Sequence, residues 1–431
     1  MSWLFLRMLA LVYLFAYWSL SGQIVALAGR DGILPGPLGD TMLVGLCYGG
    51  IALALLLLAG VAPIPVRALL WGGYLTLSSV SGEFLGYQWD ALLLETGLLA
   101  IVLAPAVLFE RRGEGPDPPV IAQWLMVWLV IRLMVGSGLV KLASGDPTWR
   151  NLTAMTFHYE TQPLPTPLAW YAHRAPMVLQ QASTAAMFGI ELLAPWLVFV
   201  PRLRRVGFAL LVGLQLLIAL TGNYAFFNLL STALCLFILN PGRMRWSLKE
   251  LAPAAYALVT LPVSLTLFLF TLGIGFVPPF ADRLYALIAP LRSVNSYGLF
   301  AVMTTERDEI VIEGSADGVA WKEYEFTYKP GALDRRPPWV APHQPRLEWQ
   351  MWFAALTTYA NAPWYASFCS RLLEGSPSVT GLLAVNPFSD RPPKYVRGVR
   401  YRYHFGSHSW WVRERIGEYS PVMTLSASVP K

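Results

Sequence analysis

Charged side chains interrupt several long apolar stretches of the sequence, and they are the first candidates for chemistry. Asp90 and Glu95 enter one stretch and Arg132 lies in the next, which ends at Lys141. A charge inside hydrocarbon is costly, so such residues normally pair with one another or line a polar pathway. At the rise of an α-helix, Arg132 would lie roughly 15 Å and Glu191, in a later stretch, roughly 21 Å below the outer ends of their helices. An arginine side chain covers that difference, so we predict that Arg132 and Glu191 form an intramembrane ion pair.

Intramembrane charges of this kind either hold a helix bundle together or line a polar cavity. A second group of candidates is His158 and Glu160, which a single tyrosine separates. A histidine beside a carboxylate can act as a general base, although such a pair in a loop is more often a structural hydrogen bond. If the chain is an enzyme, the catalytic candidates are these two residues with Asp90, Glu95 and Lys141, in a cavity that opens to the outer side.

Other reactive residue types form no recognisable site. The three cysteines, Cys47, Cys235 and Cys369, lie far apart and form no CxxC pair, which argues against thiol exchange. The histidines are scattered without the spacing of a zinc site. The sequence contains no GxSxG motif, no phosphate-binding loop and no dinucleotide-binding glycine motif in a strand–helix context. We therefore predict no metal and no cofactor.

The composition places these candidates in a membrane protein with a soluble region. Hydrophobic residues make up 55% of the 431 residues and charged residues 13%, against about 25% charged in a typical soluble domain. Apolar runs fill residues 1–277, whereas residues 278–431 have ordinary charge density. The net charge of +6 lies largely in short loops beside the apolar runs, which favours a lipid bilayer rather than nucleic acid as partner. We predict a polytopic α-helical membrane domain followed by a soluble domain.

The apolar runs predict about nine membrane spans. The run from residue 206 to residue 239 would be about 51 Å long as one helix, whereas the hydrocarbon core is about 30 Å thick. The sequence TGNY at 221–224 lies at its middle and basic residues flank both ends, so we predict that this run bends and crosses twice. The predicted spans are 3–28, 42–62, 68–82, 91–109, 121–141, 177–200, 206–239 as two, and 256–277.

Basic residues are unevenly distributed between the two sets of loops. If the N-terminus is inside, the inner loops hold most of them, including three arginines within 202–205 and, after the long run, Arg243 and Arg245. Basic loops favour the cytoplasmic side. We therefore predict that the connection 142–176 and the whole of 278–431 lie outside the cytoplasm.

The connection 142–176 is long for a segment without a span of its own. Such connections are usually functional or disordered. Aromatic side chains along it argue against disorder, so we predict that it forms a packed cap loop over the membrane bundle. Its candidate functional residues are Asp146, Trp149, His158, Tyr159 and Glu160.

Residues 278–431 have the pattern of a β-rich α+β domain. Short strands at 309–314 and 321–328 flank an Asp317-Gly318 turn, which is a hairpin signal. The other predicted elements are a half-buried strand at 395–405 and helices at 347–359 and 363–374.

After the predicted hairpin, arginines and prolines alternate with tryptophans. Aromatic residues interleaved with arginine are typical of protein-contact surfaces and of the bilayer interface. The alternative is that they pack an irregular segment against the sheet. The candidates for contact with a client protein are Arg335, Arg336, Trp339, His343, Arg346, Trp349 and Trp352.

Several of these segments together resemble the lipase maturation factor family. The matching stretches are QWD to Glu95 (88–95), GSGLVK to Trp149 (136–149), HYETQP (158–163), TGNY (221–224), NSYGLF (295–300) and 335–353. The resemblance covers nearly the whole chain. It implies a polytopic membrane protein, in animals of the endoplasmic reticulum, that assists folding and dimer assembly of secreted lipases and contacts them through its C-terminal region. Frequent arginine and alanine indicate a bacterial member, in the inner membrane.

Two functions are compatible with this sequence. The first is a membrane-anchored folding factor, a chaperone whose outer domain and cap loop bind an exported client such as a lipase. The second is an integral-membrane enzyme with the outward-facing polar cavity described above. The membrane half also resembles, more weakly, the transmembrane domain of vitamin K-dependent carboxylase, which would imply an enzyme. The folding factor is the favoured hypothesis.

Overall fold

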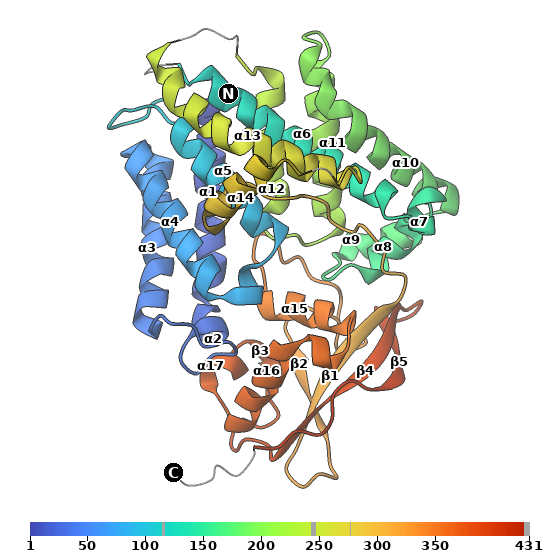
Figure 1. Ribbon diagram of the computed structural model, residues 1–431. Coiled ribbons are helices and arrows are strands. Elements are labelled where there is room, and N and C mark those ends of the chain that lie inside the picture. Colours follow the sequence, from blue (N-terminus) through green and yellow to red (C-terminus); the bar gives the residue numbers. More distant parts are fainter. Residues whose placement is uncertain (114–116, 243–246, 276, 426–431) are drawn as a thin grey trace.

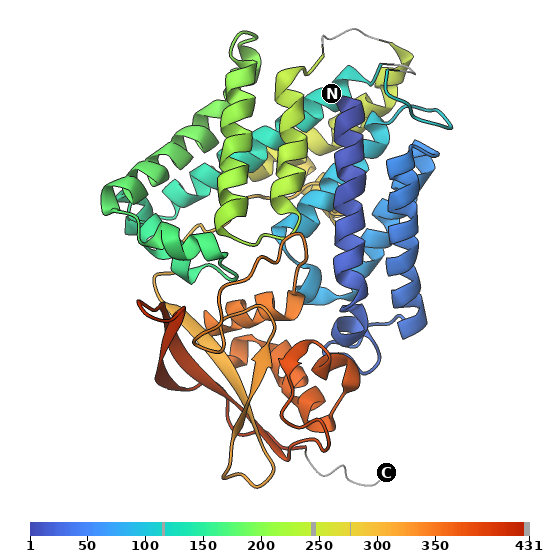
Figure 2. The ribbon, with the colours of Figure 1, turned by 180° about the vertical axis from the view of Figure 1, so that it is seen from behind.

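The computed structural model describes residues 1–113, 117–242, 247–275 and 277–425. A helical domain holds the N-terminus, and a C-terminal domain built on a sheet lies at its opposite end (Figures 1 and 2). Arg243 and Arg245, which flank a predicted span, lie outside the described residues, as do the last six residues, 426–431, of the predicted soluble domain.

The helical domain has a helix at each of the nine predicted span positions. These helices are α1 (Ser2–Ser21), α3 (Asp40–Ala59), α4 (Pro63–Val80), α5 (Gln88–Leu103), α6 (Val120–Ala143), α10 (Met177–Leu193), α11 (Arg204–Thr221), α12 (Phe227–Leu239) and α13 (Leu251–Thr271). Shorter elements are α2 (Ile24–Ala28) and the 3-10 turns η1 (Gly82–Leu85), η2 (Ala194–Phe199) and η3 (Leu248–Glu250).

Six segments of the described residues are long and apolar enough to cross a membrane. They are α1, α3, α6, α10 with η2, α11, and η3 with α13. The helices α4, α5 and α12 are shorter or less apolar. The chain is therefore an integral membrane protein, and the number of nine spans stays a prediction.

The long apolar run breaks at the predicted place. α11 ends at Thr221 and α12 begins at Phe227. Gly222, between them, forms an isolated antiparallel bridge with Pro165 of the cap loop. A β-carbon on Gly222 would collide with the side chain of Gln162. The turn therefore brings α11 and α12 together and holds the cap loop at the same point.

The cap loop contains three short helices, α7 (Pro147–Arg150), α8 (Met155–Thr161) and α9 (Pro167–His173). The carboxylate of Asp146 accepts a hydrogen bond of 2.8 Å from the backbone N–H of Thr148, which caps α7. Trp149 is buried and packs edge-on against Phe188 of α10. These helices lie between the helical domain and the sheet (Figure 1).

The C-terminal domain contains a five-stranded antiparallel sheet in the order β3-β2-β1-β4-β5. The predicted hairpin and the predicted strand at 395–405 are confirmed as β1–β2 and as β4, and the two predicted helices are confirmed as α15 and α16. The strands are β1 (Arg307–Ser315), β2 (Lys322–Phe326), β3 (Leu383–Val385), β4 (Tyr395–Phe405) and β5 (Trp411–Glu418). The helices are α15 (Arg346–Ala355), α16 (Pro363–Glu374) and α17 (Pro377–Thr380), with η5 (Tyr359–Asn361).

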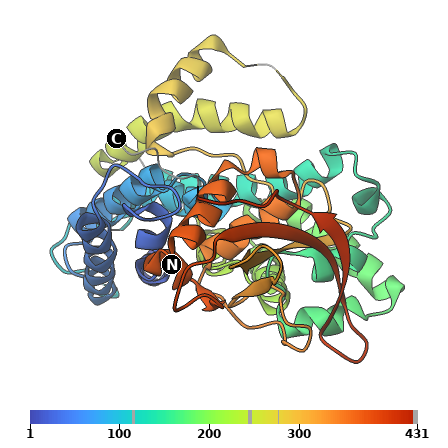
Figure 3. The ribbon, with the colours of Figure 1, turned by 90° about the horizontal axis from the view of Figure 1, so that it is seen from below.

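Between the two domains, the chain turns back along the helical domain. α14 (Pro279–Ile288), followed by η4 (Ala289–Leu291), folds onto α13, where Ile288 and Val294 pack with Val263. α13 and α14 project together from the remaining helices (Figure 3). The division predicted at residue 277 therefore marks a change of composition, because apolar residues beyond it still pack on the helical domain.

Candidate functional site at the domain junction

A buried ion pair joins the two domains. Arg346, at the start of α15, makes two hydrogen bonds of 2.9 Å to the carboxylate of Asp90 in the first turn of α5. Its guanidinium also donates to the Phe84 carbonyl at 2.7 Å, and the Tyr74 hydroxyl donates to Asp90. Both charged side chains are almost fully buried. Each charge is matched by its partner and by further hydrogen bonds, which a buried pair requires in order to be stable.

The residues just before Arg346 hold the same junction through their backbone. The side-chain amide of Gln23, between α1 and α2, accepts from the Arg346 N–H at 2.9 Å and donates to the Gln344 carbonyl at 2.8 Å. The hydroxyl of Ser19 accepts from the Gln344 N–H at 2.8 Å. The Gln344 side chain accepts from the indole N–H of Trp89 at 2.6 Å. Ser19 of α1, Gln23 after it and Trp89 of α5 therefore hold residues 344–346 against the helical domain.

The predicted client-contact surface divides into two groups. Trp339 is 54% exposed and Arg336 is also exposed, whereas Arg335 is half-buried and donates to the carbonyls of Phe326 and Lys329. The other four candidates face the helical domain or the cap loop instead of lying open to solvent, and two of them, Trp349 and Trp352, line a pocket there. These four are His343, bonded to Ser19; Arg346, bonded to Asp90; Trp349, packed on Trp89; and Trp352, bonded to the Thr161 carbonyl.

A second ion pair, between Glu95 and Arg132, holds residues 292–306, the linker between the two domains. Glu95 accepts from the Asn295 N–H at 2.9 Å and from the Tyr297 hydroxyl at 2.7 Å. Arg132 pairs with Glu95 and donates to the Asn295 carbonyl at 3.1 Å. The predicted partner of Arg132, Glu191, is therefore wrong.

The partner of Glu191 is Lys141, whose ammonium lies 2.9 Å and 3.1 Å from the two carboxylate oxygens. The depth estimate failed because it assumed helices perpendicular to the membrane. α10 inclines across α6 so that Glu191 lies beside Gly138, where an added β-carbon would come within 3.4 Å of the Glu191 β-carbon. Lys141 also lies 5.5 Å from the ring centre of Trp149, so the cap loop covers this pair.

The cap loop is held to the sheet by Arg307 and Glu160. Arg307, at the start of β1, donates to the carbonyls of Glu160 and Pro163 at 2.6 Å and 2.8 Å. The Glu160 carboxylate lies 2.9 Å from His404 Nδ1 and accepts from the Phe405 N–H at 2.7 Å. Asp146, at the other end of the loop, accepts from the Met303 N–H of the linker at 2.6 Å.

His158 lies inside the cap, 3.2 Å from the hydroxyl of Tyr224, which donates in turn to the Gln162 side chain at 2.9 Å. Burial, together with the positive charge of Lys141, lowers the pKa of His158 to about 4. The neighbouring Tyr159 ring packs edge-on against it. The imidazole is therefore neutral at pH 7.

The five residues predicted for a catalytic cavity do not gather. Asp90, Glu95 and Glu160 bind separate partners at three places, and of the five only Lys141 and His158 line one pocket. In the described residues, no three His, Cys, Asp or Glu side chains gather closely enough to hold a metal ion. The structure therefore does not show the single polar cavity that the enzyme hypothesis requires.

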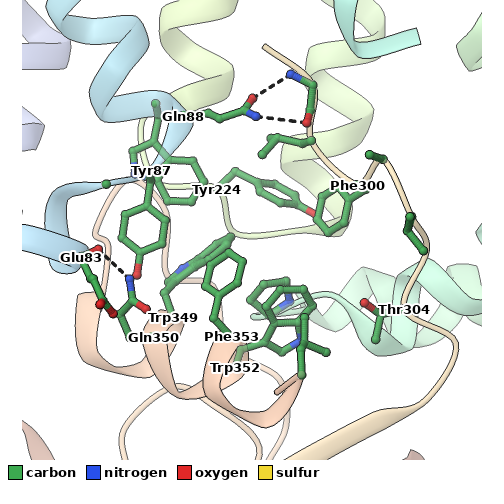
Figure 4. Close-up of a pocket in the computed structure, with 18 residues that line it drawn as sticks. Glu83, Tyr87, Gln88, Tyr224, Phe300, Thr304, Trp349, Gln350, Trp352 and Phe353 are labelled. Carbon is green, nitrogen blue, oxygen red and sulfur yellow. Dashed lines mark hydrogen bonds between the residues drawn. The ribbon is translucent and has the colours of Figure 1, made fainter. Parts of the chain in front are cut away.

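Two adjoining pockets lie at the junction. The outer pocket, of about 690 Å³, is walled chiefly by Tyr87, which directly precedes α5, and by Trp349, Trp352 and Phe353 of α15 (Figure 4). The inner pocket, of about 290 Å³, lies among α6, α8, α10 and α11. Tyr224, Leu299 and Phe300 line both pockets and form the wall between them.

Sequence reasoning missed several residues of this site. Phe300 has a left-handed backbone with φ of +55°, which is strained for a bulky side chain, and its carbonyl accepts from the Trp149 indole at 3.1 Å. Tyr87, Tyr74 and Gln344 were also missed. The stretch NSYGLF at 295–300 could have indicated this site, because its polar residues Asn295 and Tyr297 are possible partners for the buried charges of the helical domain.

Comparison with known proteins identifies relatives of both domains. The profile of the lipase maturation factor transmembrane domain matches residues 36–246, and that of the lipase maturation factor C-terminal domain matches residues 293–421. Lipase maturation factor 2 of Gallus gallus and that of Homo sapiens are each 35% identical to this chain, with alignments covering 98% of it and 81% and 82% of their own lengths. Lipase maturation factor 1 of Bos taurus is 35% identical over 86% of this chain and 73% of its own. No solved structure matches the chain.

Proposed function

Because the chain belongs to the lipase maturation factor family, we propose that it is a membrane-anchored maturation factor that assists the folding or assembly of exported proteins such as secreted lipases. The observation that carries this proposal is the match of both family domains, in order, over residues 36–246 and 293–421, together with an alignment to a curated relative over 98% of the chain. The enzyme hypothesis is not favoured, because three of its five residues are occupied by structural contacts at separate places.

The outer pocket is the proposed client-contact site. Its rim carries apolar side chains that remain exposed, with Val302 66%, Leu356 46% and Phe353 42% exposed. Exposed apolar side chains grouped around a concave surface mark interaction sites more often than scattered ones do. An apolar segment of an incompletely folded client fits this surface, whereas the buried tryptophans behind it form the pocket wall.

The proposed orientation places the C-terminal domain outside the cytoplasm, in the bacterial inner membrane or its eukaryotic equivalent, the endoplasmic reticulum membrane. The asymmetry of basic loops supports it. The arrangement of the domains agrees, because the N-terminus lies at the end away from the sheet (Figure 2). Reporter domains fused after residue 425 and before residue 1 test it. The first should be active outside the cytoplasm and the second inside, and the reverse pattern would reject the orientation.

Lipase maturation in cells that lack their own maturation factor tests the function. Co-expression of the chain with a secreted dimeric lipase should raise the activity of the secreted lipase per molecule. Phe353→Asp and Leu356→Asp should abolish most of this gain, because a charge at the rim repels an apolar segment. Val319→Asp is the matched control, since Val319 is 82% exposed on the β1–β2 turn and lies outside the outer pocket.

No gain from the unaltered chain would reject the proposed function. A gain that survives both rim substitutions would reject the outer pocket as the contact site while leaving the function in place. The enzyme hypothesis predicts the opposite pattern, in which Lys141→Met or His158→Gln alone removes all activity from a folded protein.

A further inference from the structure

The inner pocket lies between α10 and α11, which are close together where η2 joins them and diverge from there. α10 and α11 are joined through η2, and both pack against it. From there α10 inclines away from α11 (Figure 2), and α6 closes the space behind them. The cap helix α8 closes one side with Met155, His158 and Tyr159.

The pocket opens between these two helices. Ser183 of α10 and Leu217 of α11 both line it, and both are exposed, Leu217 to 61%. Each lies within a segment long and apolar enough to span a membrane. Because both segments are candidate membrane spans, we expect the opening to face the hydrocarbon of the bilayer, which no strongly hydrated solute crosses.

The lining is amphipathic. Leu133, Met134, Met187 and Leu214 provide an apolar wall, and methionine adapts to flexible chains. The Lys141–Glu191 pair borders the same space. Because its two charges cancel, the pair presents a dipole without net charge, which suits an uncharged polar group better than an anion.

We propose that the inner pocket binds one acyl chain of a bilayer glycerolipid, which enters between α10 and α11 and places its ester group near the Lys141–Glu191 pair. The volume of about 290 Å³ lies near the lower end of the range for small-molecule sites. This site is separate from the proposed client-contact site and does not depend on the proposed function. Its wall with the outer pocket is formed by Tyr224, Leu299 and Phe300.

Photocrosslinking of the full chain in vesicles tests this inference. The probe is phosphatidylcholine with a diazirine near the end of one acyl chain, present at low fraction in phosphatidylcholine–phosphatidylglycerol vesicles. After irradiation, adducts should map to the buried pocket positions Met134, Met187 and Leu214. Leu217→Trp, which blocks the opening, should lower these adducts by about tenfold, the change that corresponds to a loss of roughly 1.4 kcal/mol in binding.

Leu216→Trp is the matched control, because Leu216 is 58% exposed on the same helix and does not line the pocket. It should leave the pocket adducts unchanged. If Leu217→Trp does not fold, Ser183→Phe gives the same block from α10, with Ala182→Phe as its control. Adducts confined to outward-facing residues, or an equal loss in a blocked variant and its control, would overturn the proposal.

A diazirine-labelled free fatty acid, tested in parallel, distinguishes the two sources of an acyl chain. The phospholipid probe should label the pocket positions more strongly, because a carboxylate has no unpaired cation at the Lys141–Glu191 pair. Stronger labelling by the fatty acid would reject a glycerolipid as the ligand.

Discussion

Two buried ion pairs of the same chemical type have different surroundings in this protein. Asp90 and Arg346 join the domains, and the Asp90 carboxylate is enclosed by Arg346 and Tyr74. Lys141 and Glu191 lie within the helical domain and border the inner pocket. Neither residue of the first pair lines the outer or the inner pocket, whereas both residues of the second line the inner pocket. Burial of a charge therefore indicates that it has a partner, and only the adjoining space indicates whether it can serve a ligand.

The largest effect is expected at the closed pair. Arg346→Ala leaves Asp90 buried without a cation, which costs about 3–5 kcal/mol of stability. The domains should separate more readily, so proteases should cut the linker at 292–306 faster in the variant. Chemical unfolding in detergent and limited proteolysis measure the two effects. Arg336→Ala, at an exposed arginine of the same segment, should change neither; equal losses in both variants would contradict a role for the pair.

Replacing both charges of a pair with apolar residues should affect stability differently for the two pairs. Lys141→Met with Glu191→Leu should stay within about 1 kcal/mol of the unaltered chain, because apolar residues often replace a buried pair without loss. Asp90→Leu with Arg346→Met should remain clearly destabilised, since the Phe84 carbonyl and the Tyr74 hydroxyl lose a partner. The unfolding free energies of the two double variants test this, and similar values would show that the two pairs do not differ in their need for charged partners.

His158, which lines the inner pocket with Lys141 and Glu191, should make the stability of the protein depend on pH. The folded-state pKa of His158 is lowered to about 4 by burial and by Lys141, from an ordinary value of about 6.5. The stability that neutral His158 contributes is therefore present above pH 6.5 and is lost as the pH falls toward 4. His158→Gln should flatten the decline of melting temperature between pH 7 and pH 4.5.

Other groups also titrate between pH 7 and pH 4.5, but they are present in the unaltered chain and in the His158→Gln variant alike. Burial also lowers the pKa of His343 to about 4, and it raises the pKa of Glu348 to about 7, which acts in the opposite sense. The difference between the two melting curves isolates His158. Parallel curves would show that His158 is not the acid-sensitive group.

The smallest effect is expected at an exposed pair. Arg415 and Glu418 on β5 are each about half exposed, and pairs of this kind contribute about 0–1 kcal/mol. Arg415→Ala should therefore change the unfolding free energy by less than about 0.5 kcal/mol. A loss as large as that of Arg346→Ala would mean that burial does not explain the contrast between the pairs.

Much of the architecture could be predicted from local patterns. Apolar runs located the helices of the helical domain, and TGNY located the break between α11 and α12. The Asp317-Gly318 turn located the β1–β2 hairpin, where Gly318 has φ of +80°. Each of these features depends on hydropathy or turn chemistry within a short segment, so no distant contact was needed to infer it.

The partners of the charged residues could not be predicted in this way. Their expected depths alone predict a pair between Arg132 and Glu191. Because α10 is inclined, Glu191 instead pairs with Lys141, and Arg132 pairs with Glu95. The aromatic and basic stretch at 335–352 has the composition of a contact surface. Most of it instead packs on the helical domain, because the buried Asp90 requires the charge of Arg346.

The sequence by itself determined that this is an integral membrane protein of the lipase maturation factor family with a sheet-containing C-terminal domain, because composition, periodicity and family motifs are properties of the chain in order. Only the tertiary structure decided which charges meet, which aromatic residues are enclosed and where the two pockets lie. Those outcomes depend on helix inclination and on contacts between segments more than 200 residues apart, such as Asp90 and Arg346, and no local pattern records them.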